Sequence, residues 1–139
     1  MARRRTETRA RSRALQALYA WDVAGERGLE RVADRVWEDL AVAPEVRQVA
    51  AVLIHVIAGR RAELDREIKS VTENWRLERL GAIERSVLRL AAAELQLGET
   101  PPRVVLQESI RLAERYGTPQ SARFVNGVLD ALARRMGRL

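Results

Sequence analysis

The sequence predicts an all-α protein, a compact bundle of six or seven helices. Three observations lead to this class. Apolar residues recur at spacings of three and four along most of the chain, which is the period of a helix with one buried face. The alternation of apolar and polar residues that is typical of strands never persists. Glycine and proline divide the 139 residues into segments of helical length with short connections.

The first half of the chain is predicted to form three helices. Residues 1–8 are expected to be a flexible basic arm, and the first helix runs from about Thr8 to Ala24. The second covers about Leu29 to Leu40. The third begins at Pro44, because N–H groups in the first turn of a helix have no partner within the helix, so the N–H that proline lacks is not missed there. We expect it to bend near Gly59.

The second half is predicted to hold three further helices. They follow a connection, residues 70–80, that contains a short helical turn. The first of them ends at Leu97 and is stopped by glycine. The next starts at Thr100-Pro101-Pro102 and ends at Tyr116, and the last runs from Thr118 to about Met136. Threonine followed by proline is a frequent signal for the start of a helix.

Asn126-Gly127 is ordinarily a turn signal, yet it lies inside a sustained apolar stripe in the last of these helices. Glycine in a helix interior costs roughly 1 kcal/mol relative to alanine. The stripe outweighs this cost, so we predict a continuous helix. Close packing of a neighbouring helix is the expected reason for Gly127.

Composition excludes several classes of protein. The chain has no cysteine and one histidine, which rules out disulfides, thiolate metal sites and a histidine metal cluster. The arginine-rich start lacks the apolar run of a signal peptide. No stretch approaches the roughly 18 apolar residues of a membrane-spanning helix. We therefore expect a cytoplasmic protein without membrane partners.

Enzymatic motifs are also missing. The sequence contains no glycine-rich phosphate loop, no His-Glu-x-x-His and no Gly-x-Ser-x-Gly. Glu94 lies on an apolar stripe and is interpreted as a structural acid paired with an arginine, Arg89 or one on another helix. His55, which has apolar neighbours, is interpreted as an interior or helix-packing residue. We predict no enzyme, and no catalytic residue, metal, cofactor or small-molecule substrate.

Positive charge is concentrated at the N-terminus. The chain carries a formal net charge of +6 from 25 basic and 19 acidic residues. Residues 1–13 hold six arginines and one glutamate, which is +5 and leaves +1 for the rest. A nearly neutral body with a basic arm is typical of a polyanion-binding protein. The alternative is a solvated arm in a chain that uses arginine in place of lysine throughout.

The first predicted helix combines cations with planar side chains. Single-stranded RNA is held by arginines on its phosphates and by stacking of its bases on aromatic or guanidinium planes. We interpret Tyr19 as partly exposed and Trp21 as core, although both residues could be core. The predicted RNA-binding residues are Arg3, Arg4, Arg5, Arg9, Arg11, Arg13, Gln16 and Tyr19.

Three segments resemble the NusB family. The first is RARSRALQALYAW at residues 9–21. The second runs from Leu80 through IERSVLR at 83–89 to AEL at 93–95. The third comprises PPRVV at 101–105, ESI at 108–110 and SARFVNGVLD at 121–130, of which FVNGVLD is the most specific. The resemblance extends over about residues 8–134, with residues 25–60 similar mainly in helical pattern.

The resemblance implies a single domain, residues 9–139, of about seven helices arranged as two small sub-bundles. It also implies a factor that binds single-stranded boxA RNA of nascent ribosomal RNA transcripts together with NusE, a small-subunit ribosomal protein. The complex would help RNA polymerase read through terminators. Arg9, Arg11, Gln16 and Tyr19 match the family's RNA-facing helix. The residues that match its NusE-facing surface or lie near it are Glu84, Gln120, Ser121, Arg123 and Phe124.

Two positions depart from the family pattern, and two other functions stay open. Gln120 stands where an acid is frequent, which weakens one partner contact. Pro102 stands where an aromatic residue is frequent, which removes one stacking platform. One alternative is a protein–protein adaptor without an RNA role. The other is a relative of the N-terminal domain of RNA cytosine methyltransferases, although no cofactor-binding strand–loop–helix pattern occurs up to Leu139.

Overall fold

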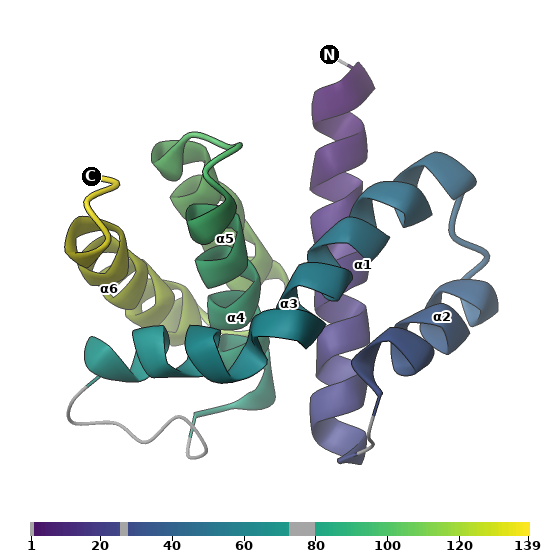
Figure 1. Ribbon diagram of the computed structural model, residues 1–139, viewed down its shortest axis with the longest axis horizontal. Coiled ribbons are helices and arrows are strands. Elements are labelled where there is room, and N and C mark those ends of the chain that lie inside the picture. Colours follow the sequence, from purple (N-terminus) through teal and green to yellow (C-terminus); the bar gives the residue numbers. More distant parts are fainter. Residues whose placement is uncertain (1, 26–27, 73–79) are drawn as a thin grey trace. The chain divides into compact units, whose positions relative to one another are not determined.

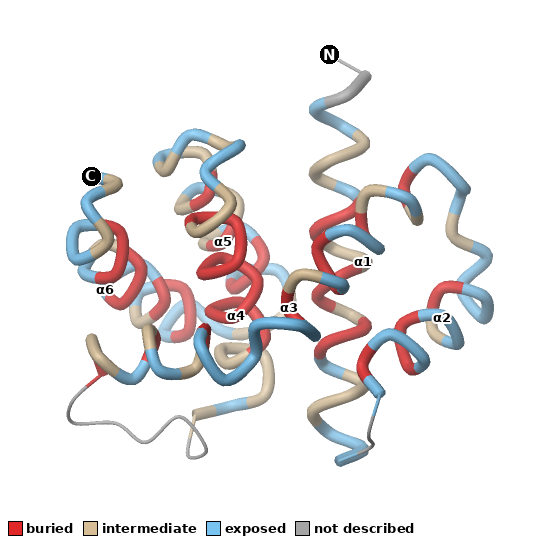
Figure 2. Tube along the Cα trace, viewed as in Figure 1, coloured by how far each residue is buried: buried red, intermediate tan, exposed pale blue. Residues whose placement is uncertain are grey.

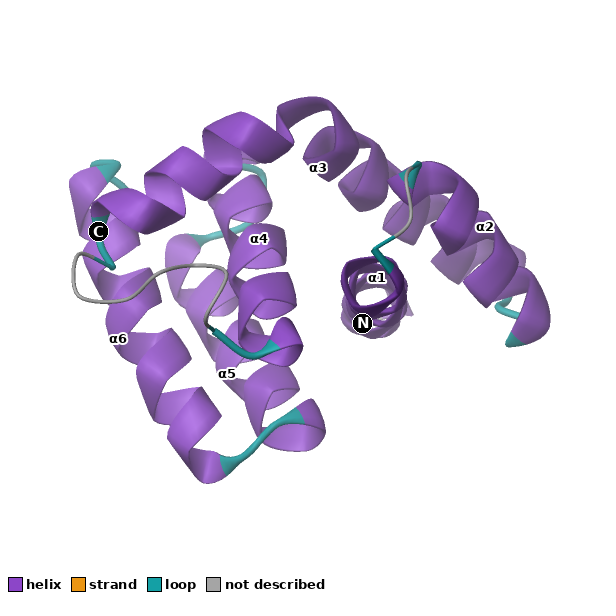
Figure 3. Ribbon diagram, turned by 90° about the horizontal axis from the view of Figure 1, so that it is seen from below, coloured by secondary structure: helices purple, strands orange, loops and turns teal. Residues whose placement is uncertain are grey.

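The computed structural model describes residues 2–25, 28–72 and 80–139, which form helices and no strand (Figures 1 and 3). The all-α prediction is confirmed. The short helical turn expected within residues 70–80 falls largely on residues 73–79, outside the described residues. The helices are α1 (Ala2–Ala24), α2 (Leu29–Asp39), α3 (Pro44–Ser70), α4 (Ala82–Leu97), α5 (Pro102–Tyr116) and α6 (Pro119–Arg135).

The chain forms two compact units, Met1–Gly59 and Arg60–Leu139, called here the N-terminal and C-terminal units. This agrees with the two sub-bundles that the resemblance implied. Helix α3 crosses the boundary, and Arg60 within it has a non-helical backbone with φ −125° and ψ 17°. The bend expected near Gly59 therefore lies one residue further along the chain.

Helix α1 begins at Ala2, so the described residues of the expected flexible arm, 2–8, form its first two turns. The segment contains no glycine or proline, and alanine and arginine are among the best helix formers. Nothing in its local sequence interrupts the helix before Thr8. The basic N-terminus is therefore a continuation of α1.

The N-terminal unit is held together by the packing of α2 on α1. Leu29, Val32, Ala33 and Trp37 follow helical spacing and are all buried. The Trp37 ring is fixed in direction because its Nε1 donates a hydrogen bond to the Arg13 carbonyl oxygen at 3.0 Å. On the other side, the Arg47 guanidinium of α3 lies 5.9 Å from the centroid of the Trp37 ring.

The C-terminal unit is built around α4, which packs against both α5 and α6. Every residue of α4 from Ser86 to Leu95 is buried, whereas α5 and α6 each bury one face (Figure 2). The run Ala91-Ala92-Ala93 has small side chains, which allows neighbouring helices to approach closely. Glu94 is buried as well, as its place on the apolar stripe predicted.

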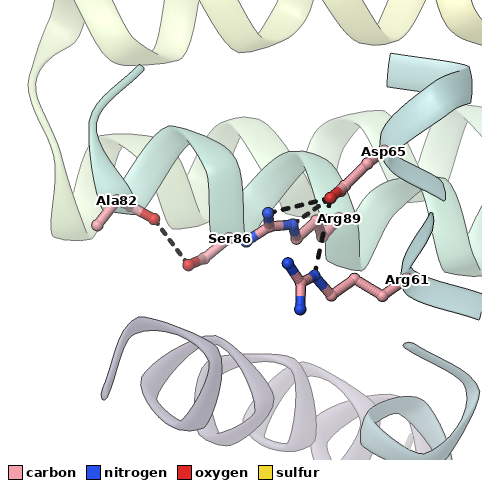
Figure 4. A network of polar contacts seen from close by, with 5 residues as sticks. All are labelled: Arg61, Asp65, Ala82, Ser86 and Arg89. Atoms are coloured by element: carbon pink, nitrogen blue, oxygen red, sulfur yellow. Dashed lines mark hydrogen bonds and ion pairs between the residues drawn. The ribbon is translucent and has the colours of Figure 1, made fainter. Parts of the chain in front are cut away.

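A buried arginine joins α4 to the second half of α3. Arg89, 8% exposed, donates from Nε to one oxygen of Asp65 at 2.9 Å and from Nη2 to the other at 3.2 Å. Arg61, which is 55% exposed, reaches the same carboxylate at 3.9 Å (Figure 4). Next to Arg89 in the same view, the Ser86 hydroxyl donates to the Ala82 carbonyl at 2.7 Å.

Two interpretations of single residues are wrong. The side chain of His55 is 76% exposed, and its Nδ1 lies 3.3 Å from both carboxylate oxygens of Glu30. Its apolar sequence neighbours face other directions, because adjacent residues of a helix point about 100° apart. Gly127 is exposed, and a Cβ at this position would meet no atom within 4 Å. Close packing against the described residues therefore does not explain this glycine.

Arg89 and Arg61 share one carboxylate, which provides a matched test of burial. Arg89→Met should lower the free energy of unfolding by about 2–4 kcal/mol, because Asp65, only 16% exposed, loses its two short hydrogen bonds. Arg61→Met should change it by less than about 1 kcal/mol, as for most exposed ion pairs. Chemical denaturation of both variants measures the difference. Equal losses would show that burial does not decide the strength of this network.

Candidate functional site

One face of α1 is exposed along most of the helix, and we call it the α1 stripe. Its members follow one another at spacings of four and three, which keeps side chains on one side of a helix. At 1.5 Å per residue it is about 27 Å long. The stripe consists of Arg5, Arg9, Ser12, Gln16, Tyr19 and Val23.

The chemistry of the α1 stripe changes along its length. Arg5 and Arg9 are exposed at its N-terminal end, and no acid belongs to it. Tyr19, 42% exposed, and Val23 form an accessible aromatic and aliphatic end. Cations can bind phosphates, and an accessible ring can stack on an unpaired base. This arrangement therefore fits a single-stranded nucleic acid along the helix.

The opposite face of α1 is buried and consists largely of small and aliphatic residues, among them Ala10, Ala14 and Leu18. Arg11 belongs to this face, and its side chain is only 4% exposed. Arg9 and Arg11 are two residues apart, so they point about 200° away from each other on a helix. The structure thus separates Arg11 from Arg5 and Arg9, with which the sequence grouped it, whereas Arg4, seven residues before Arg11, lies on the same side of the helix as Arg11.

The remaining RNA-binding candidates differ in their surroundings. The Arg13 guanidinium donates to the Gln16 side-chain oxygen at 3.0 Å, so one hydrogen bond restrains both side chains. Arg4 is exposed, and the side chain of Arg3 lies outside the described residues. Trp21, expected in the core, is half-buried. Ser12 and Val23 were missed, although their spacing from Arg9 and Tyr19 is the signal that finds them.

The second candidate surface lies in the C-terminal unit, where the first turns of α4 and α6 meet. Glu84 is the third residue of α4 and Ser121 is the third residue of α6. The Ser121 hydroxyl donates a hydrogen bond to the Glu84 carboxylate at 2.8 Å. Thr118 caps α6, because its side-chain oxygen accepts from the Ser121 N–H at 3.1 Å.

The other candidates for partner binding surround this pair. Gln120 and Arg123 are exposed on either side of Ser121, and Phe124, one turn after Ser121, is half-buried. Ser121 itself is buried, so it reaches a partner only through Glu84. The surface therefore combines the Glu84 carboxylate, a half-buried aromatic residue, an exposed amide and an exposed guanidinium.

Within residues 2–25, 28–72 and 80–139, no group of three or more histidine, aspartate or glutamate side chains could hold a metal ion. None of the described helices is long and apolar enough to cross a bilayer.

Comparison with known proteins identifies the family. The model of the NusB family matches residues 8–134. A transcription antitermination protein NusB from Anaeromyxobacter dehalogenans is 46% identical over 127 residues, which are 91% of this chain and 89% of that protein. The corresponding protein of Koribacter versatilis is 40% identical over 136 residues, 95% of this chain and 92% of its own.

Solved structures agree with these sequence matches. The structure of T. maritima NusB has a TM-score of 0.85 and 32% identity, covering 92% of this chain and 90% of its own. A structure of the antitermination factors NusB and NusE in complex with double-stranded RNA has a TM-score of 0.85 and 30% identity. The match covers 94% of this chain and 98% of the chain in that structure. Antitermination proteins are not enzymes, as the sequence predicted. The chain belongs to the NusB family.

Proposed function

We propose that this chain is a transcription antitermination factor that binds the single-stranded boxA element of nascent ribosomal RNA transcripts together with NusE. The bound complex promotes read-through by RNA polymerase in the bacterial cytoplasm. The observation that carries the proposal is the α1 stripe, in which exposed Arg5 and Arg9 precede the accessible ring of Tyr19. The names of the relatives and the composition of the NusB–NusE–RNA structure support it.

The two candidate surfaces suit different ligands because they differ in net charge: the α1 stripe carries two arginines and no acid, whereas Glu84 balances Arg123 on the second surface. Arginines on the α1 stripe attract phosphates, and each phosphate that they neutralise releases a counterion. Because Glu84 balances Arg123, the second surface has no net attraction for phosphates and fits a protein partner better than RNA. We therefore assign RNA to α1 and NusE to the surface of Glu84, Gln120, Arg123 and Phe124, with Ser121 acting through Glu84.

A preference for single strands rests on Tyr19. A ring that is 42% exposed offers a plane on which an unpaired base can stack. Bases within a duplex are already stacked on one another, so they gain nothing from the ring. The RNA of the NusB–NusE structure is double-stranded, which makes the preference of this chain a direct question for experiment.

The salt dependence of RNA binding tests the assignment to α1. Each phosphate contact on a single strand contributes about −0.7 to the slope of log affinity on log salt. Arg5→Ala/Arg9→Ala should therefore flatten the slope by about 1.4. Arg31→Ala/Arg66→Ala removes the same charge from exposed positions on α2 and α3 and should leave it unchanged. Fluorescence anisotropy with boxA RNA measures both; identical slopes for the two double variants would show that the α1 stripe does not contact the RNA, and a wild-type chain that does not bind the RNA would favour an adaptor without an RNA role.

Stacking on Tyr19 is tested by comparing RNA forms. Tyr19→Ala should weaken binding of single-stranded boxA RNA by about 1–3 kcal/mol, and Tyr19→Phe, which keeps the ring, should restore most of it. Neither should alter the melting temperature greatly, because the side chain is exposed. A duplex of the same sequence should bind more weakly to the wild-type protein and be insensitive to Tyr19→Ala. Equal effects on both forms would exclude stacking.

Replacing Arg9 should change RNA affinity, whereas replacing Arg11 should change the stability of the fold. Arg9→Ala should weaken RNA binding and leave thermal stability unchanged, because Arg9 is exposed. Arg11→Ala should lower the free energy of unfolding by about 1–3 kcal/mol, because it removes a buried polar side chain from its surroundings. RNA affinity and thermal melting of both variants decide the question. If Arg11→Ala behaves like Arg9→Ala in both measurements, Arg11 faces the RNA.

A further inference from the structure

We propose that Gly81 and Ser121 hold the Glu84 carboxylate in one orientation, in which its second oxygen meets a cationic side chain of the protein partner. The inference rests on the proposed function, in which that partner is NusE. It assigns to Gly81 and Ser121 the role of positioning residues. The donor on the partner is an arginine or lysine side chain.

Ser121 fixes one oxygen of Glu84. Its hydroxyl accepts a hydrogen bond from the Thr118 N–H at 3.2 Å, so its own hydrogen is directed to Glu84 Oε1 at 2.8 Å. Its backbone N–H is held in turn by the Thr118 side chain. The hydroxyl is therefore part of the cap of α6, and its direction is set by the fold of that turn.

Gly81 determines where the rest of the carboxylate lies. Its φ of −66° and ψ of 153° are extended values that any residue adopts, so the backbone does not require glycine. A Cβ on Gly81 would lie 2.4 Å from Glu84 Oε2, so the carboxylate occupies the space of the missing side chain. On the far side of the pair, a Cβ on Gly117 would lie 2.9 Å from the Ser121 hydroxyl. The pair thus lies between two residues without side chains.

Glu84 is half-buried, so its side chain is partly exposed to solvent. Ser121 is the only described residue that donates a hydrogen bond to this carboxylate, and the neighbouring Arg85 donates to the Leu80 carbonyl. The negative charge lies in the first turn of α4, where the helix dipole favours it. A half-buried carboxylate with one oxygen already bonded is complementary to a cation that approaches from outside.

Gly81→Ala tests this arrangement without removing any functional group. The added methyl group should displace the Glu84 side chain and weaken NusE binding about tenfold or more, which is the effect of losing one charge-assisted hydrogen bond. The free energy of unfolding should fall by no more than about 1 kcal/mol, because alanine tolerates this backbone although it is a poorer N-cap residue than glycine. Isothermal titration calorimetry with NusE measures the affinity of the full-length chain. Wild-type affinity in a folded Gly81→Ala protein overturns the inference.

Two controls separate positioning from a general effect of losing a glycine. Gly59→Ala changes an exposed glycine whose Cβ would meet no atom within 4 Å, and it should leave NusE binding unchanged. In a Glu84→Ala background, Gly81→Ala should have no further effect, because no carboxylate remains to be displaced. An equal loss with and without Glu84 would show that Gly81 acts in another way and would overturn the inference.

The outcomes also distinguish the inference from the proposed function. If the wild-type chain does not bind NusE, the proposed partner is wrong and the inference fails with it. If the wild-type chain binds NusE and Gly81→Ala binds equally well, only the positioning of Glu84 is wrong. If Gly81→Ala binds weakly, Gly59→Ala binds normally and the effect depends on Glu84, the inference is supported.

Discussion

The burial of α4 on all sides is the constraint on which the C-terminal unit depends. A helix that is surrounded from Ser86 to Leu95 has no surface to offer along its middle. Its one buried arginine, Arg89, must be neutralised internally, which Asp65 does with two hydrogen bonds. The two ends of α4 are left to present functional groups, and at its C-terminal end Gln96 is already hydrogen-bonded to Arg60 and Glu63. Glu84 occupies the first turn, and the same turn is where the helix dipole favours a carboxylate.

Helix α1 differs from α4, because only one of its faces is buried. Trp37 of α2 lies against it and is fixed in direction by the Arg13 carbonyl. This packing determines which face of α1 stays accessible, and the helical period then decides which arginines are exposed. Arg9 falls on the exposed side and Arg11 on the buried side, although they are separated by a single residue. The exposure of each arginine on α1 therefore depends on its position in the helical period.

Much of the fold could be predicted from the sequence, because glycine and proline mark the ends of α2, α5 and α6, and apolar spacing marks their buried faces. One error arose where nearness in sequence was taken for nearness in space. His55 was grouped with apolar neighbours that point elsewhere. The sequence likewise does not show that Arg11 is buried, and its assignment to the RNA-binding residues stays a prediction. Glu84 and Ser121 were both named from resemblance, but they are 37 residues apart, and no local pattern indicates their hydrogen bond or the role of Gly81.

The chemistry of the two surfaces explains why such a factor would act as part of a pair. Exposed Arg4, Arg5 and Arg9 could neutralise about three phosphates, and contacts of this kind are weakened by physiological salt and carry no sequence information. A second RNA-binding protein docked at Glu84 would add contacts to the same RNA molecule. Once one protein is bound, the other engages the RNA at high effective concentration, which raises the joint affinity well above either alone. A well-oriented carboxylate then serves RNA binding indirectly, by keeping that second protein in place.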